Sequence, residues 1–272
     1  MFVLDERYEL IRLLGEGGLG TVYVAKDLET GEDCVVKMAS FSLDVHDFHD
    51  FFYARETLRR EYLKLATLPP HPNCIRVLGV GGYYYVMEMV KGSHLFSPNQ
   101  KVVDKGTQTW TFSVMYQVFE ALHHYVSNGQ VHLDLKPSNI MLEGVNGTTR
   151  VVLIDPLITH EDVDLFVGTP EYSAPEFMGD KSGETHQADL YAAGLLFYEL
   201  LMGKRPWLHD DPVELWQSRK VPWTYPSLDG CWPKPVIDLI DQLLLPEPGN
   251  RPSSAKECLD RLKPYVNGNM VI

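Results

Sequence analysis

The stretch from His132 to Asn139 reads His-Leu-Asp-Leu-Lys-Pro-Ser-Asn and gathers several side chains that could do chemistry. Asp134 could accept a proton from an attacking hydroxyl, and Lys136 could neutralise a phosphate in transfer. Asn139, together with Asp155 at the end of a short apolar run, offers the hard oxygen ligands that Mg²⁺ prefers. A lone Asp or His would carry little weight, but this ordered set indicates metal-assisted chemistry on a phosphate group.

A second candidate is the glycine-rich stretch Gly15-Glu16-Gly17-Gly18-Leu19-Gly20. Taken alone, this pattern fits an ordinary hairpin turn at least as well as a ligand site. A dinucleotide-binding motif would need a helix directly after the glycines, whereas Thr21–Val24 is predicted to be a strand. Glycine lets backbone N–H groups approach a phosphate without a Cβ in the way. The stretch therefore fits a turn between two strands that covers the phosphates of a nucleotide.

Lys37 follows the apolar run Cys34–Val36, where it could equally be an exposed charge at a strand edge. Glu61 decides between these alternatives, because it falls at helical spacing within an apolar stripe of Leu58, Tyr62 and Leu65. A carboxylate on a buried stripe is costly unless it is paired. Glu56 falls on the opposite, solvated face. The sequence therefore predicts an ion pair between Lys37 and Glu61.

Two parts of the chain must position these residues. The first part is predicted to form a small, mostly antiparallel sheet with one helix: strands over Tyr8–Leu14, Thr21–Lys26, Asp33–Met38, Cys74–Val80 and Tyr83–Met89, and a helix over Asp44–Leu68. The second part is predicted to be mainly helical, over Thr109–Ser127, Gln187–Met202, Pro212–Lys220, Pro233–Leu244 and Ser254–Leu262. The boundary falls near Val90–Ser93, where small residues follow the last strand.

These motifs together resemble the catalytic domain of the eukaryotic-type (Hanks-type) protein kinases, and Lys136-Pro137 resembles their serine/threonine branch. Residues 168–176, with Gly-Thr-Pro-Glu-Tyr and then Ala-Pro-Glu, resemble the substrate-docking end of the activation segment, which small-molecule phosphotransferases lack. The resemblance covers about residues 8–264. It implies an α+β, bilobal fold that forms one functional domain, with an antiparallel-sheet N-lobe over residues 1–90, a mainly helical C-lobe over residues 91–272, and ATP between the lobes.

The resemblance also implies a role for each candidate residue. Asp134 and Lys136 would be catalytic, and Asn139 and Asp155 would hold Mg²⁺, with Mn²⁺ as a substitute. Lys37 would hold the α- and β-phosphates of ATP. The remaining nucleotide-binding residues would be Leu14, Gly15, Gly17, Gly20, Val22, Val35, Glu61, Met87, Glu88, Val90 and Leu142.

Several of these residues have more particular roles by resemblance. Met87 would be the gatekeeper, the backbone of Glu88 and Val90 would hydrogen-bond adenine, and Val22 and Leu142 would sandwich the base. For the apolar members, packing in the core is an equally good description. The residues that would support substrate docking and the local structure are Thr169, Glu176, Asp189 and Arg251, with Asp189 anchoring the catalytic loop and Arg251 pairing with Glu176.

The sequence departs from the family pattern in two places. Asp155-Pro156-Leu157 stands where the family has Asp-Phe-Gly. Proline biases Asp155 towards an extended conformation, and Leu157 cannot adopt the positive φ that glycine allows, so we expect this turn to be held in one state. Leu133 replaces the arginine that binds an activation-segment phosphate, which removes a phosphate switch through that residue. These departures leave a pseudokinase, a binding module with the same fold, as the alternative to an active enzyme.

The formal net charge of −13 disfavours nucleic acid or an anionic membrane as the main partner. An acidic surface is compatible with a basic protein substrate, although solubility alone is the better explanation of the charge. The four cysteines lie far apart, without metal-ligand or disulfide-framework spacing, which indicates a reducing, cytoplasmic location. The sequence shows neither a signal peptide nor an apolar run that could span a bilayer. The protein substrate and the oligomeric state stay open.

Overall fold

A computed structural model describes residues 2–17, 20–39, 48–95, 108–145, 147–157, 169–177, 185–204 and 232–266, together with Glu214, Ser218 and Leu228. The chain divides into two compact units, Met1–Lys91 and Gly92–Ile272. The predicted helix over Pro212–Lys220 lies outside the described residues, apart from Glu214 and Ser218.

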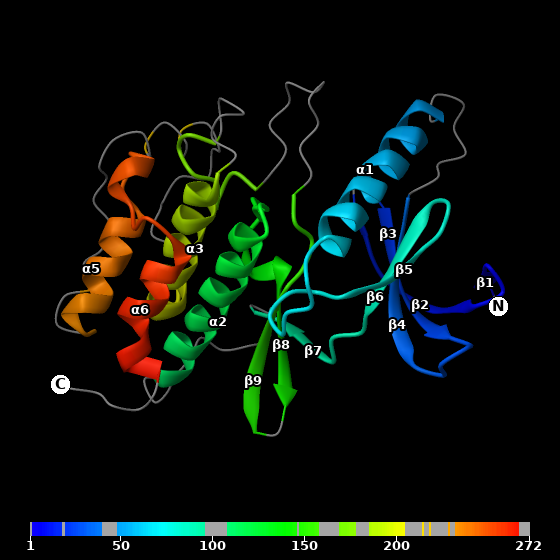
Figure 1. Cartoon of the computed structure of the whole chain (residues 1–272), viewed down its shortest axis with the longest axis horizontal. Coiled ribbons are helices and arrows are strands. Elements are labelled where there is room, and N and C mark those ends of the chain that lie inside the picture. The colour runs from blue at the N-terminus through cyan, green and yellow to red at the C-terminus, as the bar shows by residue number, and fades with distance from the viewer. Residues whose placement is uncertain are drawn as a thin grey trace. The chain divides into compact units, whose positions relative to one another are not determined.

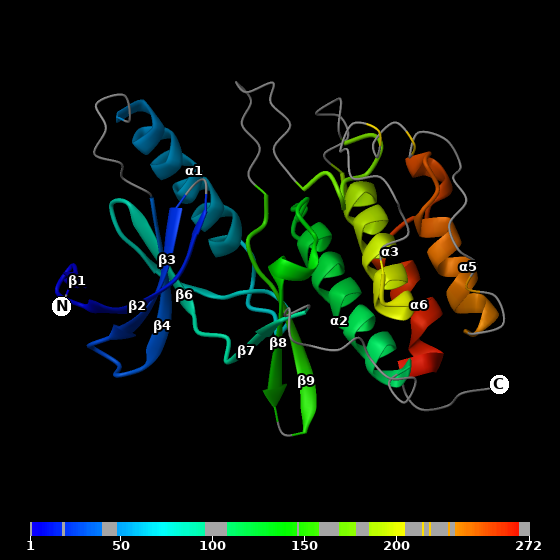
Figure 2. The same ribbon diagram turned by 180° about the vertical axis from the view of Figure 1, so that it is seen from behind.

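The N-terminal unit is a six-stranded sheet with one helix. Its strands follow the order β1-β2-β3-β4-β6-β5, and each neighbouring pair is antiparallel. Their bounds are β1 Phe2–Leu4, β2 Tyr8–Gly17, β3 Gly20–Asp27, β4 Asp33–Ala39, β5 Val77–Val80 and β6 Tyr84–Glu88. The helix α1, Phe48–Ala66, packs against β4, β5 and β6, as Figures 1 and 2 show from opposite sides.

The two faces of this sheet carry different residues, because side chains alternate along each strand. One face holds a hydrophobic core cluster: Leu4, Tyr8, Ala25, Cys34, Val36, Tyr84 and Val86. On the other face, Lys37 of β4 lies between Val22 of β3 and Tyr85 of β6, and Val35 lies opposite Met87. Directly opposed residues of antiparallel strands point to the same side. The sheet therefore gathers these five residues on the face away from the core cluster.

The C-terminal unit combines a small sheet with helices. The sheet has the order β7-β8-β9, with β7 Gly92–His94, β8 Ile140–Val145 and β9 Thr148–Leu153. The helices are α2 Gln108–Ser127, α3 His186–Met202, α5 Lys234–Leu243 and α6 Ala255–Val266, with 3₁₀ turns at Pro137–Asn139 and Pro248–Asn250. The helix α2 packs against α3, α6 and β9 (Figure 1).

Aromatic and aliphatic side chains fill the space between these helices. Phe112 of α2 meets Phe197 of α3 edge to face, with ring centroids 6.2 Å apart, and both rings are fully buried. The helix α3 is buried along most of its length, as its apolar sequence predicts. It ends at Gly203, whose φ of 68° suits glycine and whose N–H donates to the Glu199 carbonyl.

A side chain of α2 closes the outer edge of β9. Gln117 donates from Nε2 to the Thr149 carbonyl at 2.9 Å, and its Oε1 accepts from the Val151 N–H at 3.0 Å. The amide thus makes two hydrogen bonds to β9 of the kind that a neighbouring strand would make. This contact ties α2 to the strand that leads towards Asp155.

The predicted fold class is confirmed, since an antiparallel sheet is followed by a mainly helical part. Some bounds differ: β5 begins at Val77 rather than Cys74, and the described part of the first helix begins at Phe48. The strands β1, β7 and β8 were not predicted. Three cysteines, Cys34, Cys74 and Cys258, are free and buried. Within the described ranges, none of the helices has the length and apolar character needed to cross a membrane.

Candidate active site

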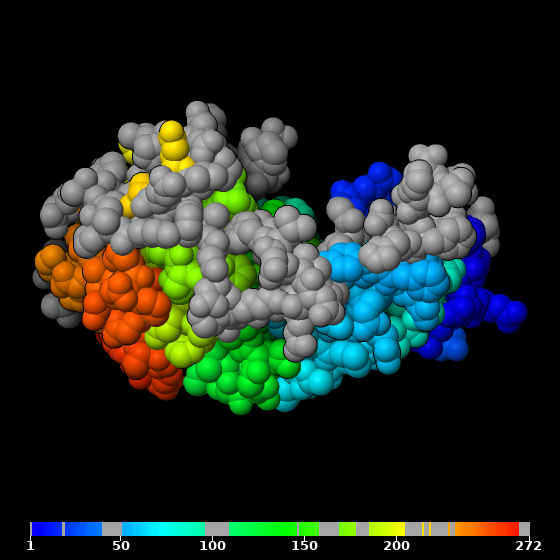
Figure 3. Space-filling view, turned by 90° about the horizontal axis from the view of Figure 1, so that it is seen from above, coloured from blue at the N-terminus to red at the C-terminus, as the bar shows by residue number. Residues whose placement is uncertain are grey.

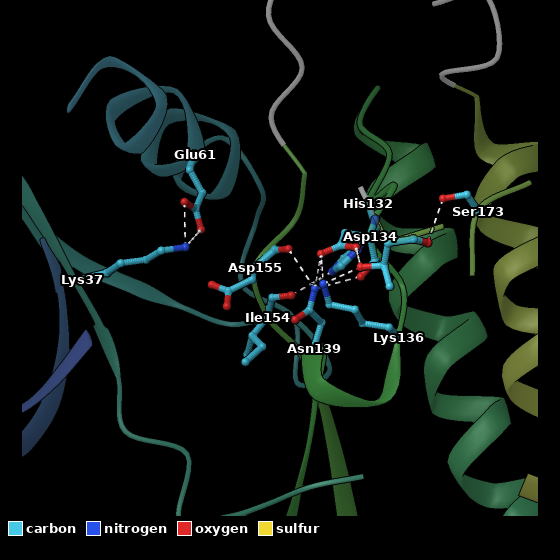
Figure 4. A network of polar contacts seen from close by, with 10 residues as sticks. Lys37, Glu61, His132, Asp134, Lys136, Asn139, Ile154, Asp155 and Ser173 are labelled. Carbon is cyan, nitrogen blue, oxygen red and sulfur yellow. Dashed lines mark hydrogen bonds and ion pairs between the residues drawn. The ribbon is translucent and has the colours of Figure 1, made fainter. Parts of the chain in front are cut away.

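The predicted ion pair between Lys37 and Glu61 is present in the N-terminal unit. Lys37 Nζ lies 2.8 Å from Glu61 Oε1 and 3.0 Å from Oε2, and the two side chains are only 13% and 5% exposed. Glu61 points from α1 towards the sheet, where it meets Lys37 (Figure 4). The outer side of α1 lies on the molecular surface (Figure 3), with Leu63 exposed. Glu61 is therefore buried together with most of the apolar stripe of α1, as the sequence predicted.

The glycines between Gly15 and Gly20 differ in which atoms lie close to the position that a Cβ would occupy. Gly15 and Gly17 lie at the end of β2. Among the described residues, a Cβ added to Gly15 would meet no atom within 4 Å, and a Cβ added to Gly17 would meet only the Gly20 carbonyl oxygen, at 3.9 Å. A Cβ on Gly20 would lie 2.4 Å from the Met38 carbonyl oxygen. Glycine is thus required at Gly20 by the close approach of β4. At Gly15 and Gly17 the absence of a Cβ instead leaves the backbone accessible. Gly18 and Leu19 lie outside the described residues.

The other nucleotide-binding candidates of this unit lie on or beside the sheet. Val22, Val35 and Met87 share the face of Lys37. Leu14 is exposed on β2, and Val90 is buried after β6. The Glu88 N–H donates to the Arg76 carbonyl at 2.9 Å, so the main-chain atom of Glu88 that could meet adenine is its carbonyl oxygen.

In the C-terminal unit, Asp189 anchors the predicted catalytic loop, residues 132–139. Its carboxylate, in the first turn of α3 and 2% exposed, accepts from the His132 N–H at 2.8 Å and from the Leu133 N–H at 2.6 Å. Leu133 has a φ of 65°, a left-handed conformation that disfavours a leucine by about 1–2 kcal/mol. The two charge-assisted hydrogen bonds to Asp189 hold this strained backbone in place.

Asp134 lies at the centre of a polar network (Figure 4). Its Oδ1 accepts from the Thr169 hydroxyl at 2.9 Å, and its Oδ2 lies 2.8 Å from Lys136 Nζ. Lys136 Nζ also donates to the Thr169 hydroxyl at 2.7 Å. Asn139 Nδ2 donates to Asp134 Oδ2 at 2.7 Å and to the Asp134 carbonyl at 2.9 Å. The sequence-predicted residues Lys136, Asn139 and Thr169 thus all contact Asp134.

The extended conformation expected for Asp155 is wrong, because its φ is 52°. Hydrogen bonds on both sides of Asp155 explain this value. Before it, the Ile154 N–H donates to the Asn139 carbonyl at 3.0 Å, and after it the Leu157 N–H donates to the His132 carbonyl at 2.8 Å. The chain must turn sharply between these anchors, and aspartate tolerates the left-handed region better than most residues do.

Glu176 and Arg251 form the predicted pair in the C-terminal unit. Arg251 is fully buried and donates from Nη1 and Nη2 to the two carboxylate oxygens of Glu176, at 2.6 and 2.8 Å. Its remaining donors reach the main-chain carbonyls of Leu245, Pro246 and Gln187. The docking-end segment 169–177 is therefore joined at Thr169 to the catalytic loop and at Glu176 to Arg251. Leu142 of β8 lies opposite Val151.

Two polar contacts near the site were missed by the sequence reasoning. The Tyr85 hydroxyl donates to Glu61 Oε1 at 2.8 Å, and the Ser173 hydroxyl donates to the Thr169 carbonyl at 2.9 Å. A signal existed for the first: Tyr85 belongs to a mostly apolar strand, and a tyrosine hydroxyl needs a partner when it is buried.

Comparison with known proteins decides the family. The family model that is described as the protein kinase domain matches residues 8–263 of the chain. The chain belongs to the protein kinase domain family. The kinase domain is 30% identical over 261 residues to CBL-interacting serine/threonine-protein kinase 20 of Arabidopsis thaliana, with 92% of this chain and 56% of that protein covered. It is 29% identical to serine/threonine-protein kinase pkn2 of Myxococcus xanthus, with 96% of this chain and 32% of that protein covered. The predicted resemblance is thereby confirmed at the level of the family, and the chain spans about half or less of these relatives.

Proposed function

We propose that this kinase domain is catalytically active and transfers the γ-phosphoryl group of Mg-ATP to serine or threonine hydroxyls of a protein substrate. The observation that carries the proposal is the contact of Asp134 with Lys136 and Thr169. A carboxylate held this way keeps a fixed direction for an incoming hydroxyl, and the neighbouring ammonium supplies positive charge for a phosphate. The relatives are named as serine/threonine kinases, which supports the acceptor class.

In this mechanism, Asp134 orients the acceptor hydroxyl and takes its proton as the bond to phosphorus forms. Lys136 stabilises the negative charge on the transferring group. Lys37, steadied by Glu61, binds the phosphates of the nucleotide. The backbone of Gly15 and Gly17 covers these phosphates, and the apolar candidates from Val22 to Leu142 hold the adenine.

The residues proposed as metal ligands fit a divalent cation. Asn139 turns Nδ2 towards Asp134, so Oδ1 is the atom that would face a cation. Asn139 Nδ2 donates to the main-chain carbonyl of Asp155 at 3.4 Å, so the two residues are neighbours, and the Asp155 carboxylate would be the second protein ligand. One amide and one carboxylate oxygen make a typical partial shell for Mg²⁺, or for Mn²⁺, with phosphate and water completing it. The cation would neutralise charge on the nucleotide phosphates.

The second candidate function is that of a pseudokinase, which the Asp-Pro-Leu turn and Leu133 favour. Against it stands the retention of Lys37, Glu61, Asp134, Asn139 and Asp155, the residues that would bind the nucleotide and the metal and orient the acceptor. The formal net charge of −13 is compatible with a basic protein substrate, and the identity of the substrate stays open. The cytoplasmic location stays a prediction.

The test is phosphotransfer from labelled ATP to a generic basic protein, by the wild-type chain and by Asp134→Asn, with and without Mg²⁺. We expect the variant to lose roughly 10²–10⁴-fold in turnover, the typical contribution of a general base, because the amide cannot accept the proton. Its affinity for Mg-ATP, measured by calorimetry, should stay near that of the wild type. Equal turnover of the two proteins would remove Asp134 as the base. Nucleotide binding without transfer by the wild type would establish the pseudokinase instead.

A further inference from the structure

Tyr85 occupies an unusual place for a polar group, at the second position of β6 and beside the Lys37–Glu61 pair. Its side chain is 1% exposed, and its hydroxyl donates to Glu61 Oε1 at 2.8 Å. The same oxygen accepts from Lys37 Nζ at 2.8 Å. The pair register places Tyr85 directly opposite Lys37 on the neighbouring strand, so both side chains rise from the same face of the sheet.

From this geometry we propose that Tyr85 is a positioning residue, whose hydroxyl fixes the Glu61 carboxylate and, through it, the direction of the Lys37 ammonium. The contact itself needs no assumption about activity, whereas its effect on nucleotide binding rests on the proposed function. Tyr85 does not touch the phosphates in this proposal, because it acts through Glu61.

The physical reason lies in the freedom that a buried glutamate would otherwise have. A carboxylate that meets a single ammonium can rotate about its last torsion and exchange its two oxygens. The Tyr85 side chain is attached to a strand whose backbone is fixed by the sheet, so the hydrogen bond from its hydroxyl holds Oε1 of Glu61 in one place. Both donors also stabilise the ionised form of Glu61, which burial disfavours. The carboxylate is thus kept charged and in one orientation.

The ring of Tyr85 is itself braced. Tyr62, one residue after Glu61 on α1, packs against it with ring centroids 6.3 Å apart and an interplanar angle of 42°. Tyr85 is also paired on its other side with Val80 of β5. Helix α1 therefore supplies both the acceptor of the hydroxyl and a neighbour for the ring, which restricts where the hydroxyl can point.

The simpler explanation is that Tyr85 is an ordinary core tyrosine that found an acceptor. The adjacent residue provides a matched control. Tyr84 is also on β6, is 4% exposed, and donates its hydroxyl to a carboxylate oxygen of Asp5 at 2.5 Å. It points to the opposite face, into the core cluster. Tyr84→Phe therefore removes the same atom and the same kind of bond as Tyr85→Phe, but leaves Glu61 and Lys37 untouched.

The first measurement requires neither nucleotide nor activity. The rate at which acetic anhydride acetylates Lys37 is followed by peptide mass spectrometry in the wild type, Tyr85→Phe and Tyr84→Phe. An ammonium held in an ion pair reacts slowly, because acylation needs the free amine. We expect Tyr85→Phe to react about tenfold faster, the size of one hydrogen bond to a charged group, and Tyr84→Phe to react at the wild-type rate. Glu61→Gln serves as the reference for a broken pair.

The second measurement is steady-state phosphotransfer with ATP and protein substrate varied separately. Tyr85→Phe should raise KM for ATP about tenfold and leave KM for the protein substrate unchanged, a split that general destabilisation does not produce. Unfolding in urea should show similar stability losses for Tyr85→Phe and Tyr84→Phe. If Tyr85→Phe does not fold, Tyr62→Leu is the alternative variant. Tyr62 is half-buried, and its replacement removes the ring contact that restricts Tyr85, so acetylation of Lys37 should become faster by a smaller factor.

These outcomes separate the two proposals. Faster acetylation in Tyr85→Phe without any phosphotransfer by the wild type would support the positioning role and overturn the proposed function. Phosphotransfer by the wild type, with equal acetylation rates and equal KM values for ATP in Tyr85→Phe and Tyr84→Phe, would overturn the positioning role alone.

Discussion

Lys37–Glu61 in the N-terminal unit and Arg251–Glu176 in the C-terminal unit are both ion pairs in which a buried or nearly buried basic group meets a glutamate. They differ in how the basic group is held. Each of the five N–H donors of Arg251 has an acceptor, three of which are main-chain carbonyls, and the guanidinium also lies over the Tyr191 ring. Lys37 instead donates to both carboxylate oxygens of Glu61 from the sheet face that it shares with Val22 and Tyr85.

The difference teaches how the two cations are used. A planar guanidinium with every donor engaged joins several segments rigidly, which suits a structural role at the end of the docking segment. An ammonium is a compact point charge that can turn and share its charge with a ligand. We therefore expect the Arg251 pair to determine stability and the Lys37 pair to determine chemistry. Reciprocal exchange of the two basic residues tests this division.

The largest effect should come from Lys37→Arg. The variant keeps the positive charge beside Glu61, so its free energy of unfolding in urea should fall by less than that of Arg251→Lys. The forked group cannot take the position of the ammonium towards phosphate, and we expect kcat/KM for ATP to fall roughly a hundredfold. Full activity in this variant would show that a cation of either shape is sufficient at this position.

Arg251→Lys should show the opposite behaviour. Lysine offers three donors to an environment built for five, so buried carbonyls lose their partners. We expect the free energy of unfolding to fall by about 3 kcal/mol, since each unsatisfied buried acceptor costs about 1–3 kcal/mol. At a temperature where the variant is folded, its affinity for nucleotide should match that of the wild type. A stability loss no larger than that of Lys37→Arg would contradict the structural role of this pair.

The smallest effect is expected at a third pair, Arg7–Asp27, where the arginine is partly exposed. Hydrogen bonds from Arg7 lower the pKa of Asp27 to about 2, from an ordinary value of 3.8. Because the folded-state pKa is the lower one, this stabilisation is present above pH 4 and is lost as the pH falls towards 2. When the free energy of unfolding is measured from pH 7 to pH 2, it should fall less with decreasing pH in Asp27→Asn than in the wild type. Parallel curves for the two proteins would rule out the assignment.

The sequence predicted those parts of the site that depend on residue type and local period. Glu61 was placed inside because its neighbours form an apolar stripe, and Asp134, Lys136 and Asn139 lie together because the loop between them is short. Their chemical roles stay predictions. The conformation of Asp155 was predicted wrongly because the rule for a residue before proline is local. The hydrogen bonds that turn the chain there come from His132 and Asn139, far back in the sequence.

Other features were missed for a similar reason. The partner of Tyr85 depends on the register of β4 and β6 and on where α1 lies, and neither can be read from the strand itself. Strand β1 has three residues, which is too short for any periodicity, and its turn uses Asp5 and Glu6 at positive φ without a glycine as a signal.

Gln117 has a consequence for the edge of the small sheet. An outer strand presents unused N–H and C=O groups and is a template on which a strand from another molecule can add, the first step towards aggregation. At β9, the Thr149 carbonyl and the Val151 N–H are already engaged by the amide of Gln117. A leucine of similar size would fill the same space but would leave both groups unsatisfied. One polar side chain from α2 thus satisfies two main-chain groups at a sheet edge, and neither group is left to pair with a strand of another molecule.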